Sequence, residues 1–244
     1  MAWTAAATLY CRLFRLPSAR CPPQSRCLVR CSAAHSPDAV DKEYADLNLR
    51  ALYTDRGQHL RIRQHVNPLS SSFSEPTEPP EWKDVFEDPM LPLMVDIGCG
   101  SGRFLIWHAK NSEEKRNYLG LEIREKCPDP HFKKRHHKRR VLQPSLADSI
   151  TKNLSIGGRV FVQSDVFEVA ADMRQRFDGY PDVLEHVDCV DKDLQCDKEG
   201  WLLDNPLGIR TEREIHAELE GATIYRRMYQ KNREYVNKAE RKKR

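Results

Sequence analysis

The chain has 244 residues, of which 31% are charged and 39% are hydrophobic, and its formal net charge is +4 at pH 7. This length suits one domain of moderate size with extensions. No segment reaches the roughly 20 apolar residues that a membrane-spanning helix needs, so we expect no membrane partner. The small net charge excludes a polycation overall, but the charge is distributed unevenly along the chain.

The first 37 residues contain no Asp or Glu, several Ala and Ser, and five arginines. This composition is typical of an organelle transit peptide, which we place at residues 1–35. The run Val29-Arg30-Cys31-Ser32-Ala33 resembles a stromal processing site and favours the chloroplast, with the mitochondrion as the alternative. The competing interpretation is a disordered basic tail on a cytosolic protein.

Residues 36–90 are expected to form an N-terminal extension and linker. The part over 38–66 shows a modest apolar face of helical spacing, and six prolines and a serine run lie between Pro68 and Pro92. Prolines and serines at this density indicate a linker or a segment draped over a core. We place a folded domain at 91–228 and a basic tail at 229–244.

A glycine-rich turn is the most informative feature of the sequence. An apolar segment ends at Asp96, and Gly98, Gly100 and Gly102 follow before a helix-like segment over 103–110. A dinucleotide site needs the spacing G-x-G-x-x-G, whose third glycine would fall at Arg103. The loop therefore predicts a site for an adenosyl ligand such as S-adenosylmethionine rather than for NAD.

A second acid supports the nucleoside site. The segment over 118–123 has the pattern of a strand and carries Glu122, 20 residues beyond Gly102. An acid at the tip of the second strand of a βαβ unit can accept hydrogen bonds from both ribose hydroxyls. The alternative is a glycine turn followed by a solvated glutamate.

The remaining elements alternate between helix and strand. Apolar residues recur every fourth position from Leu142 to Leu154 and predict an amphipathic helix. A strand over 159–163 and a helix over 166–177 are expected next, followed by a loop-rich segment over 180–210 anchored by Trp201. From Thr211 onward the chain is expected to be helical. This alternation predicts an α/β sheet.

Six of the ten residues from His131 to Arg140 are Lys or Arg, and the run follows Pro128-Asp129-Pro130. An isolated basic run is most often a solvated segment or a nuclear import signal. Because this one lies inside the folded region, it predicts a phosphate-binding surface for RNA. The candidate RNA contacts are Lys134, Arg135, Lys138, Arg139 and Arg140.

Several motifs occur together in one order. They are Asp96-Ile97-Gly98-Cys99-Gly100-Ser101-Gly102, Gly120-Leu121-Glu122-Ile123-Arg124, Pro128-Asp129-Pro130-His131-Phe132-Lys133-Lys134-Arg135-His136, Gln163-Ser164-Asp165 and Thr211-Glu212-Arg213-Glu214. In this combination the chain resembles the TrmB-type tRNA (guanine-N7-)-methyltransferases over roughly residues 90–228. The Pro-Asp-Pro basic motif is specific to that family, whereas the glycine loop is shared by many methyltransferases.

The resemblance implies a Rossmann-like class I methyltransferase sheet with flanking helices. It implies S-adenosylmethionine as the cofactor, no metal, tRNA as the partner, and 7-methylguanosine at position 46 of the variable loop as the product. By position, Asp96, Gly98, Gly100, Gly102 and Glu122 would contact the cofactor, Asp129 would be the catalytic acid, and Lys133, Asp165, Thr211 and Glu214 would hold the substrate.

Each substrate-side assignment has a structural alternative. Asp129 could cap a turn between prolines, and Lys133 could be one more phosphate contact. Asp165 could be the N-cap of the following helix. Thr211 and Glu214 also have the spacing of a plain capping box.

The chain departs from the family between Glu122 and Asp129, which are only seven residues apart. In the family this interval holds a helix, a strand, another helix and most of a fourth strand, on the order of 50 residues. The match is good up to Lys126 and resumes at Cys127, as expected for a skipped exon or a defective gene model. We therefore expect a sheet that lacks about two strands and the family's contacts to the adenine side of the cofactor.

Two functions follow from these observations. The first is an S-adenosylmethionine-dependent tRNA methyltransferase. The second is a catalytically impaired, shortened isoform that acts at most as an RNA-binding protein.

Overall fold

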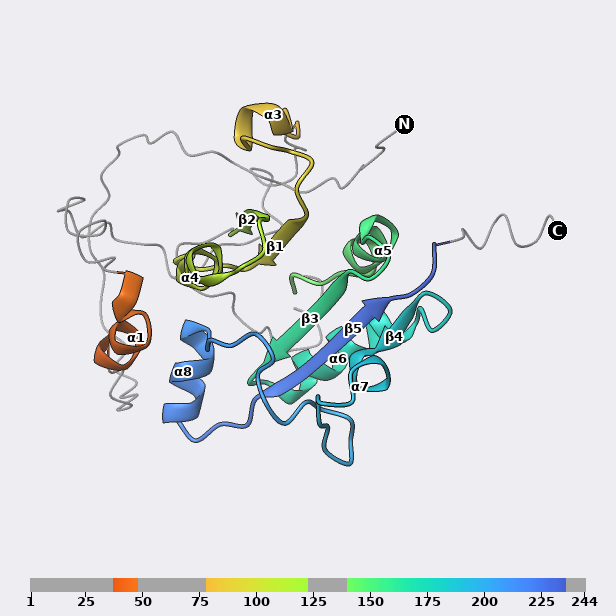
Figure 1. Cartoon of the computed structure of the whole chain (residues 1–244). Coiled ribbons are helices and arrows are strands. Elements are labelled where there is room, and N and C mark those ends of the chain that lie inside the picture. Colours follow the sequence, from red (N-terminus) through yellow and green to blue (C-terminus); the bar gives the residue numbers. More distant parts are fainter. Residues whose placement is uncertain (1–36, 48–77, 123–139, 236–244) are drawn as a thin grey trace, which may run out of the picture.

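The computed structural model describes residues 37–47, 78–122 and 140–235, which contain short helices and five strands (Figure 1). The catalytic and basic residues predicted between 123 and 139, and the transit peptide, lie outside these ranges. In chain order the elements are α1 (Pro37–Glu43), η1 (Ala45–Leu47), α3 (Trp82–Val85), β1 (Leu93–Ile97), α4 (Arg103–Asn111), β2 (Asn117–Leu121), α5 (Pro144–Asn153), β3 (Arg159–Ser164), α6 (Phe167–Asp178), β4 (Leu184–His186), α7 (Val187–Val190), α8 (Glu212–Leu219) and β5 (Tyr225–Lys231).

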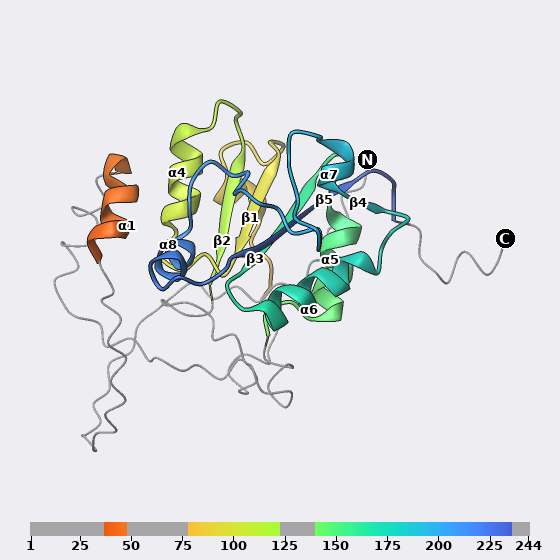
Figure 2. The same ribbon diagram turned by 90° about the horizontal axis from the view of Figure 1, so that it is seen from below.

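The strands form two sheets. β1 and β2 pair in parallel, and a second sheet has the order β3-β5-β4 with antiparallel pairing. α4 packs against β2, whereas α6 packs against β3 and β5. Figure 2 shows the strands in the order β2, β1, β3, β5 and β4 with helices on either side. This arrangement confirms the predicted α/β class.

The first βαβ unit matches the prediction closely. Asp96 of β1 is in register with Gly120 of β2. α4 begins at Arg103, directly after the glycine loop, and Glu122 follows the last residue of β2. The predicted order of strand, glycine turn, helix and strand is confirmed.

The predicted amphipathic helix is α5, and it covers the second sheet. Leu146, Ile150 and Leu154 pack against a buried cluster that includes Phe177 of α6 and Tyr229 of β5. Pro144 occupies the first turn of the helix, where its missing N–H leaves no hydrogen bond unmade. The apolar spacing therefore identified the packed face correctly.

The prediction that the chain is helical from Thr211 onward is wrong beyond Leu219. α8 ends there, Gly221 adopts a φ of 72°, and the chain returns as strand β5. β5 is central to its sheet, yet Arg226, Arg227 and Lys231 are all buried in it. These charges conceal the apolar pattern of a buried strand.

The segment over 180–210 contains β4 and α7, which the sequence did not predict. The expected anchor is confirmed, because Trp201 is only 5% exposed. β5 extends to Lys231, so the domain boundary predicted at 228 falls inside a strand.

The N-terminal helix α1 is part of the packed structure. Val40 and Tyr44 are 3% exposed and share a cluster with Phe104 of α4 and Ile215 of α8. The Tyr44 hydroxyl donates a hydrogen bond to the carbonyl oxygen of Arg210, 2.5 Å away. This part of the predicted extension therefore packs against the domain.

The edge of β1 away from β2 and the edge of β3 away from β5 have no paired strand among the described residues. The buried apolar residues also form separate clusters on the two sides of the molecule. One cluster gathers α1, α4 and α8, another gathers α5, α6 and β5, and Leu207 packs against the first and against a third, smaller cluster around Met228. This division agrees with a class I methyltransferase fold that lacks strands between β2 and α5.

Among the described residues, no helix is both long enough and apolar enough to cross a membrane.

Candidate active site

The glycine loop makes a tight turn at the carboxyl end of β1. Gly98, Gly100 and Gly102 have φ values of 90°, 55° and 77°, a region that side chains rarely adopt. The Gly98 N–H donates to the carbonyl oxygen of Leu121 at 2.7 Å, which ties the loop to the end of β2. A Cβ built on Gly100 or Gly102 would meet nothing within 4 Å, so the outer side of the loop is open to a ligand.

Glu122 lies beside this loop. Its Oε2 accepts a hydrogen bond from the Gly100 N–H at 3.0 Å. The contact fixes the carboxylate next to the backbone that a nucleoside would approach. Asp96 is the second-last residue of β1 and Glu122 directly follows the parallel strand β2, so both acids lie near the carboxyl end of this strand pair.

The surroundings of the loop change the acidity of Asp96 and of Cys99. Burial and the nearby charge of Glu122 raise the pKa of Asp96 to about 6. Burial, with the charges of both acids, raises the pKa of the Cys99 thiol to about 11, so this cysteine is not a thiolate nucleophile at neutral pH. The site therefore concentrates negative charge that a cationic ligand would relieve.

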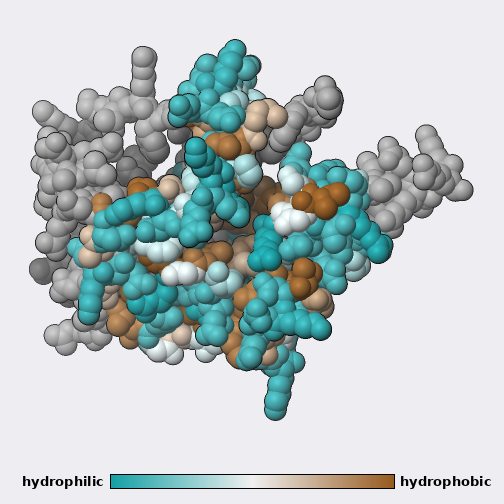
Figure 3. Space-filling view, viewed as in Figure 1, coloured by the Kyte–Doolittle hydropathy of each residue, from teal (hydrophilic) through white to brown (hydrophobic). Residues whose placement is uncertain are grey.

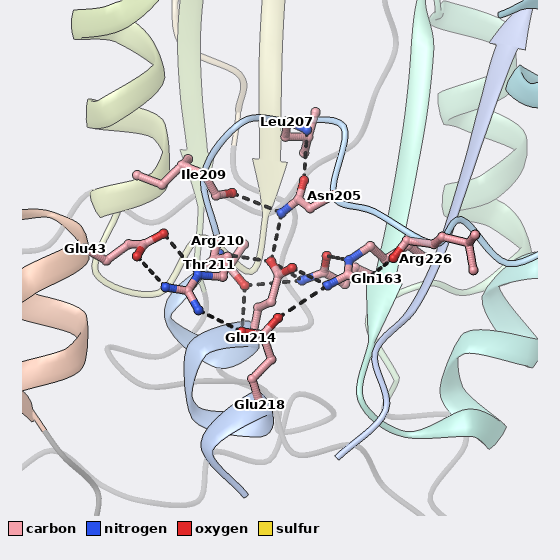
Figure 4. A network of polar contacts seen from close by, with 11 residues as sticks. Glu43, Gln163, Asn205, Leu207, Ile209, Arg210, Thr211, Glu214, Glu218 and Arg226 are labelled. Carbon is pink, nitrogen blue, oxygen red and sulfur yellow. Dashed lines mark hydrogen bonds and ion pairs between the residues drawn. The ribbon is translucent and has the colours of Figure 1, made fainter. Parts of the chain in front are cut away.

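A fully closed capping box begins α8. The Thr211 hydroxyl accepts from the Glu214 N–H at 3.2 Å, and Glu214 Oε2 accepts from the Thr211 N–H at 3.2 Å. The same Oε2 accepts from Asn205 Nδ2 at 2.9 Å and from Gln163 Nε2 at 3.2 Å (Figure 4). Glu214 is 1% exposed, so the structural alternative for the Thr-x-x-Glu motif is confirmed.

The other oxygen of Glu214 is paired with Arg226 of β5, whose side chain is 9% exposed. Substrate contact by Thr211 and Glu214 remains a prediction, but this carboxylate already has a partner on each oxygen. Because both charges are out of water, removal of Glu214 would leave Arg226 with the more distant and partly exposed Glu218, at 3.8 Å, as its acidic partner.

Glu212 and Arg213, which lie between Thr211 and Glu214 in the same helical turn, make contacts toward the two sheets. Glu212 accepts from the hydroxyl of Ser101 in the glycine loop and pairs with Arg103 at 3.4 Å. Arg213 donates to Oδ2 of Asp165, with the Nε contact at 3.1 Å. One helical turn therefore joins the cofactor side of the site to the end of β3.

Asp165 is held as an anion by this contact. Burial alone would raise the pKa of Asp165, but the hydrogen bonds and charge of Arg213 outweigh it and lower the pKa. The N-cap alternative for Asp165 is wrong, because the N-cap of α6 is Val166, whose N–H donates to the Ser164 hydroxyl. Its predicted role at the guanine edge stays a prediction.

Arg140 is the described member of the basic cluster. Its side chain is 5% exposed and pairs with Asp172 of α6 at 3.3 Å. This geometry attaches the start of α5 to α6, and RNA contact by Arg140 stays a prediction. Asp129, Lys133, Lys134, Arg135, Lys138 and Arg139 lie outside the described residues.

Sequence reasoning missed the residues that connect these parts. Arg226 and Asn205 belong to no recognisable sequence motif. Arg210 pairs with Glu43 of α1 at 2.6 Å, although the two residues lie far apart in the sequence. Hydrogen bonds from Arg210 lower the pKa of Glu43 and keep it charged. Such partners are separated in sequence, and only the fold brings them together.

Comparison with known proteins agrees with this geometry. The profile of a family described as "Putative methyltransferase" matches residues 126–227. A tRNA (guanine-N(7)-)-methyltransferase of Synechococcus elongatus is 36% identical over 216 residues, covering 70% of this chain and 96% of the relative. Proteins of the same name from Trichormus variabilis and Thermosynechococcus vestitus are each 34% identical and cover 70% and 73% of this chain.

The fold and the glycine-loop site define a class I methyltransferase architecture. The chain belongs to the tRNA (guanine-N(7)-)-methyltransferase family, because the relatives are matched over nearly their whole length at more than 30% identity.

The comparison also bears on the missing segment. Seventy per cent of this chain is about 170 residues, so roughly 45 positions of the 216-residue alignment have no residue here. The family profile begins to match at Lys126, beside the junction that the motifs placed between Lys126 and Cys127. Both observations agree with the loss of an internal segment of about two strands.

We predict that Glu214→Gln lowers the free energy of unfolding by roughly 3 kcal/mol, because the buried Arg226 would then have the partly exposed Glu218, 3.8 Å away, as its acidic partner in place of Glu214. Glu220→Gln, at the other end of α8, removes a carboxylate whose contact with Arg213 is 3.5 Å long and partly exposed, and we expect less than about 1 kcal/mol. Denaturant titration of both variants measures the difference. Equal losses would contradict the central role of Glu214.

We also predict that Asp96→Asn stabilises the protein above pH 6. A folded-state pKa of about 6 means that the folded chain holds a proton that the unfolded chain releases near pH 4. Ionisation of Asp96 therefore destabilises the fold as the pH rises through this window, and Asn removes the penalty.

Thermal melts between pH 4 and pH 8 measure this effect. The gain in melting temperature of Asp96→Asn over the parent protein should shrink as the pH falls from 6 to 4. The exposed Asp204→Asn control should melt at the same temperature as the parent protein at each pH. An Asp96→Asn variant that is less stable than the parent protein at pH 7.5 would refute the raised pKa of Asp96.

Proposed function

We propose that this chain binds S-adenosylmethionine and methylates N7 of guanosine 46 in the variable loop of tRNA. The observation that carries the proposal is the glycine loop with Glu122 at the edge of the β1–β2 pair. The names of the relatives supply the tRNA substrate and the N7 position on guanine.

The described residues fit the cofactor on three counts. The loop is open where a Cβ would stand at Gly100 and Gly102. Glu122 is already oriented by the Gly100 N–H and can accept from ribose hydroxyls. The acids Asp96 and Glu122 suit a ligand that carries a sulfonium cation, since a nearby positive charge would favour the ionised form of Asp96, whose pKa is raised in the unliganded protein.

S-adenosylmethionine supplies a reactive methyl group when bound. Guanine N7 already presents an in-plane lone pair, so the protein needs no base to expose a nucleophile. The work of the chain is orientation, which can remove several kcal/mol of the barrier. The guanine ring gains positive charge on methylation, and the resemblance assigns Asp129 to stabilise that charge.

On the substrate side, Asp165 can accept from the N1–H and 2-amino group of guanine. Arg213 lowers its pKa, so the acceptor stays ionised at neutral pH. Lys133 and the other cations of the run would contact tRNA phosphates, and their affinity would fall steeply with salt.

The test combines binding and product analysis on the full-length chain. Calorimetry with S-adenosylmethionine should show saturable binding, weakened about tenfold or more in Glu122→Gln through loss of charged hydrogen bonds. Mass spectrometry of transcribed tRNA should show 7-methylguanosine that disappears when guanosine 46 is replaced by adenosine. Glu220→Gln serves as the matched control.

Two outcomes would refute parts of this proposal. Methylation that persists on the adenosine-46 transcript would refute the position. Absence of cofactor binding together with salt-dependent tRNA binding would refute the enzyme and favour the shortened RNA-binding form, which the comparisons do not support.

We further propose that the chain acts in the chloroplast. The acid-free, arginine-containing first 37 residues support this proposal. A radiolabelled full-length chain should be imported and shortened near Val29–Ala33 by isolated chloroplasts. Import by mitochondria alone, or by neither organelle, would refute the chloroplast assignment.

A further inference from the structure

The carboxylate that follows β3 is held by a cation from α8. Asp165 comes directly after Ser164, the last residue of β3, and its side chain is 14% exposed. Arg213, in the first turn of α8, donates to Oδ2 of Asp165 from Nε, at 3.1 Å, and also from Nη2. A carboxylate oxygen offers about two lone-pair sites. The guanidinium therefore fills the acceptor capacity of Oδ2.

Guanine and the arginine side chain present similar donor edges. The N1–H and the 2-amino group of guanine are adjacent donors in one plane, as are the N–H groups of a guanidinium. A carboxylate that receives one of these edges is suited to receive the other through both of its oxygens. Adenine has an acceptor at N1 and no donor at C2, so it cannot take the place of the arginine.

The contact between Arg213 and Asp165 can open at small cost. The Arg213 side chain is 42% exposed, and its contact with Glu220 is long, at 3.5 Å. Figure 3 shows mostly hydrophilic residues over the region of α8. A guanidinium that leaves Asp165 therefore regains water, and ion pairs with such an exposed partner are weak.

The same contact preserves the acceptor before a substrate arrives. Burial raises the pKa of Asp165, but the hydrogen bonds and the charge of Arg213 outweigh burial and lower the pKa. A protonated Asp165 would present an O–H donor toward the N1–H of guanine. Within the described part of the chain, Arg213 supplies the charge that keeps Asp165 ionised.

We propose that Arg213 is a positioning residue that occupies Asp165 in the free protein and yields Oδ2 to guanine when tRNA binds. The proposal rests on the proposed methylation of guanosine and deepens it. Displacement of Arg213 lowers the apparent affinity for guanosine, because the acid is open in only a fraction of the free molecules. In return, Asp165 stays ionised in the free protein.

Binding of two tRNA transcripts to the full-length chain tests this role. The transcripts carry guanosine or adenosine at position 46, and fluorescence anisotropy gives both affinities. Their ratio cancels the general loss of phosphate attraction that follows removal of a cation. Arg213→Met should raise the ratio in favour of guanosine about fivefold at pH 8, because the weak ion pair no longer competes. Arg116→Met, which removes a partly exposed cation just before β2, should leave the ratio unchanged.

The pH dependence separates this role from a purely structural one. Without Arg213, burial raises the pKa of Asp165, so the gain of Arg213→Met should disappear as the pH falls from 8 to 5. The ratio of the parent protein should change less over the same range. Arg213→Lys keeps the charge but lacks the planar pair of donors, so its ratio at pH 8 should be intermediate. This variant decides the matter where Arg213→Met fails to fold.

Three results would overturn the role of Arg213. They are equal affinities for the two transcripts in every variant, an unchanged ratio in Arg213→Met, and a lower ratio in Arg213→Met. The last would mean that Arg213 stays on Asp165 in the complex. A raised ratio without any 7-methylguanosine would support the role and refute only the proposed methylation. Methylation of guanosine 46 with an unchanged ratio would refute the role of Arg213 alone.

Discussion

The structure depends on one buried carboxylate. Glu214 accepts hydrogen bonds from the Thr211 N–H, Asn205, Gln163 and Arg226, which come from its own helix, a loop and two strands of the second sheet. A buried anion is tolerated only when it is paired and its lone pairs are satisfied. The first turn of α8 is therefore fixed in position, and Glu212 and Arg213 of that turn are fixed with it.

That turn matters more in this chain than a capping box usually does. The two larger apolar clusters, on the β1 side and the β3 side, share no residue, Leu207 joins the first to the smaller cluster around Met228, and no strand among the described residues bridges the two sides. Glu212 holds Ser101 and Arg103 near the cofactor loop, while Arg213 holds Asp165 at the end of β3. Polar contacts from one turn thus connect parts that a continuous sheet would otherwise join.

The sequence predicts the features that are local. The glycine loop, Glu122 and the α5 face follow from backbone conformation and periodicity, which neighbouring residues determine. β5 could not be predicted, because Arg226, Arg227 and Lys231 are buried in it and conceal its apolar pattern. The capping box was visible as an alternative, but its importance comes from Arg226 and Asn205, which only the fold brings to Glu214.

Hydrogen exchange measured by mass spectrometry tests most directly whether this turn couples the two sides of the site. We predict that S-adenosylmethionine slows exchange at residues 98–102 and, through Glu212, also at residues 211–216. Slowing confined to the glycine loop, with 211–216 unchanged, would contradict it.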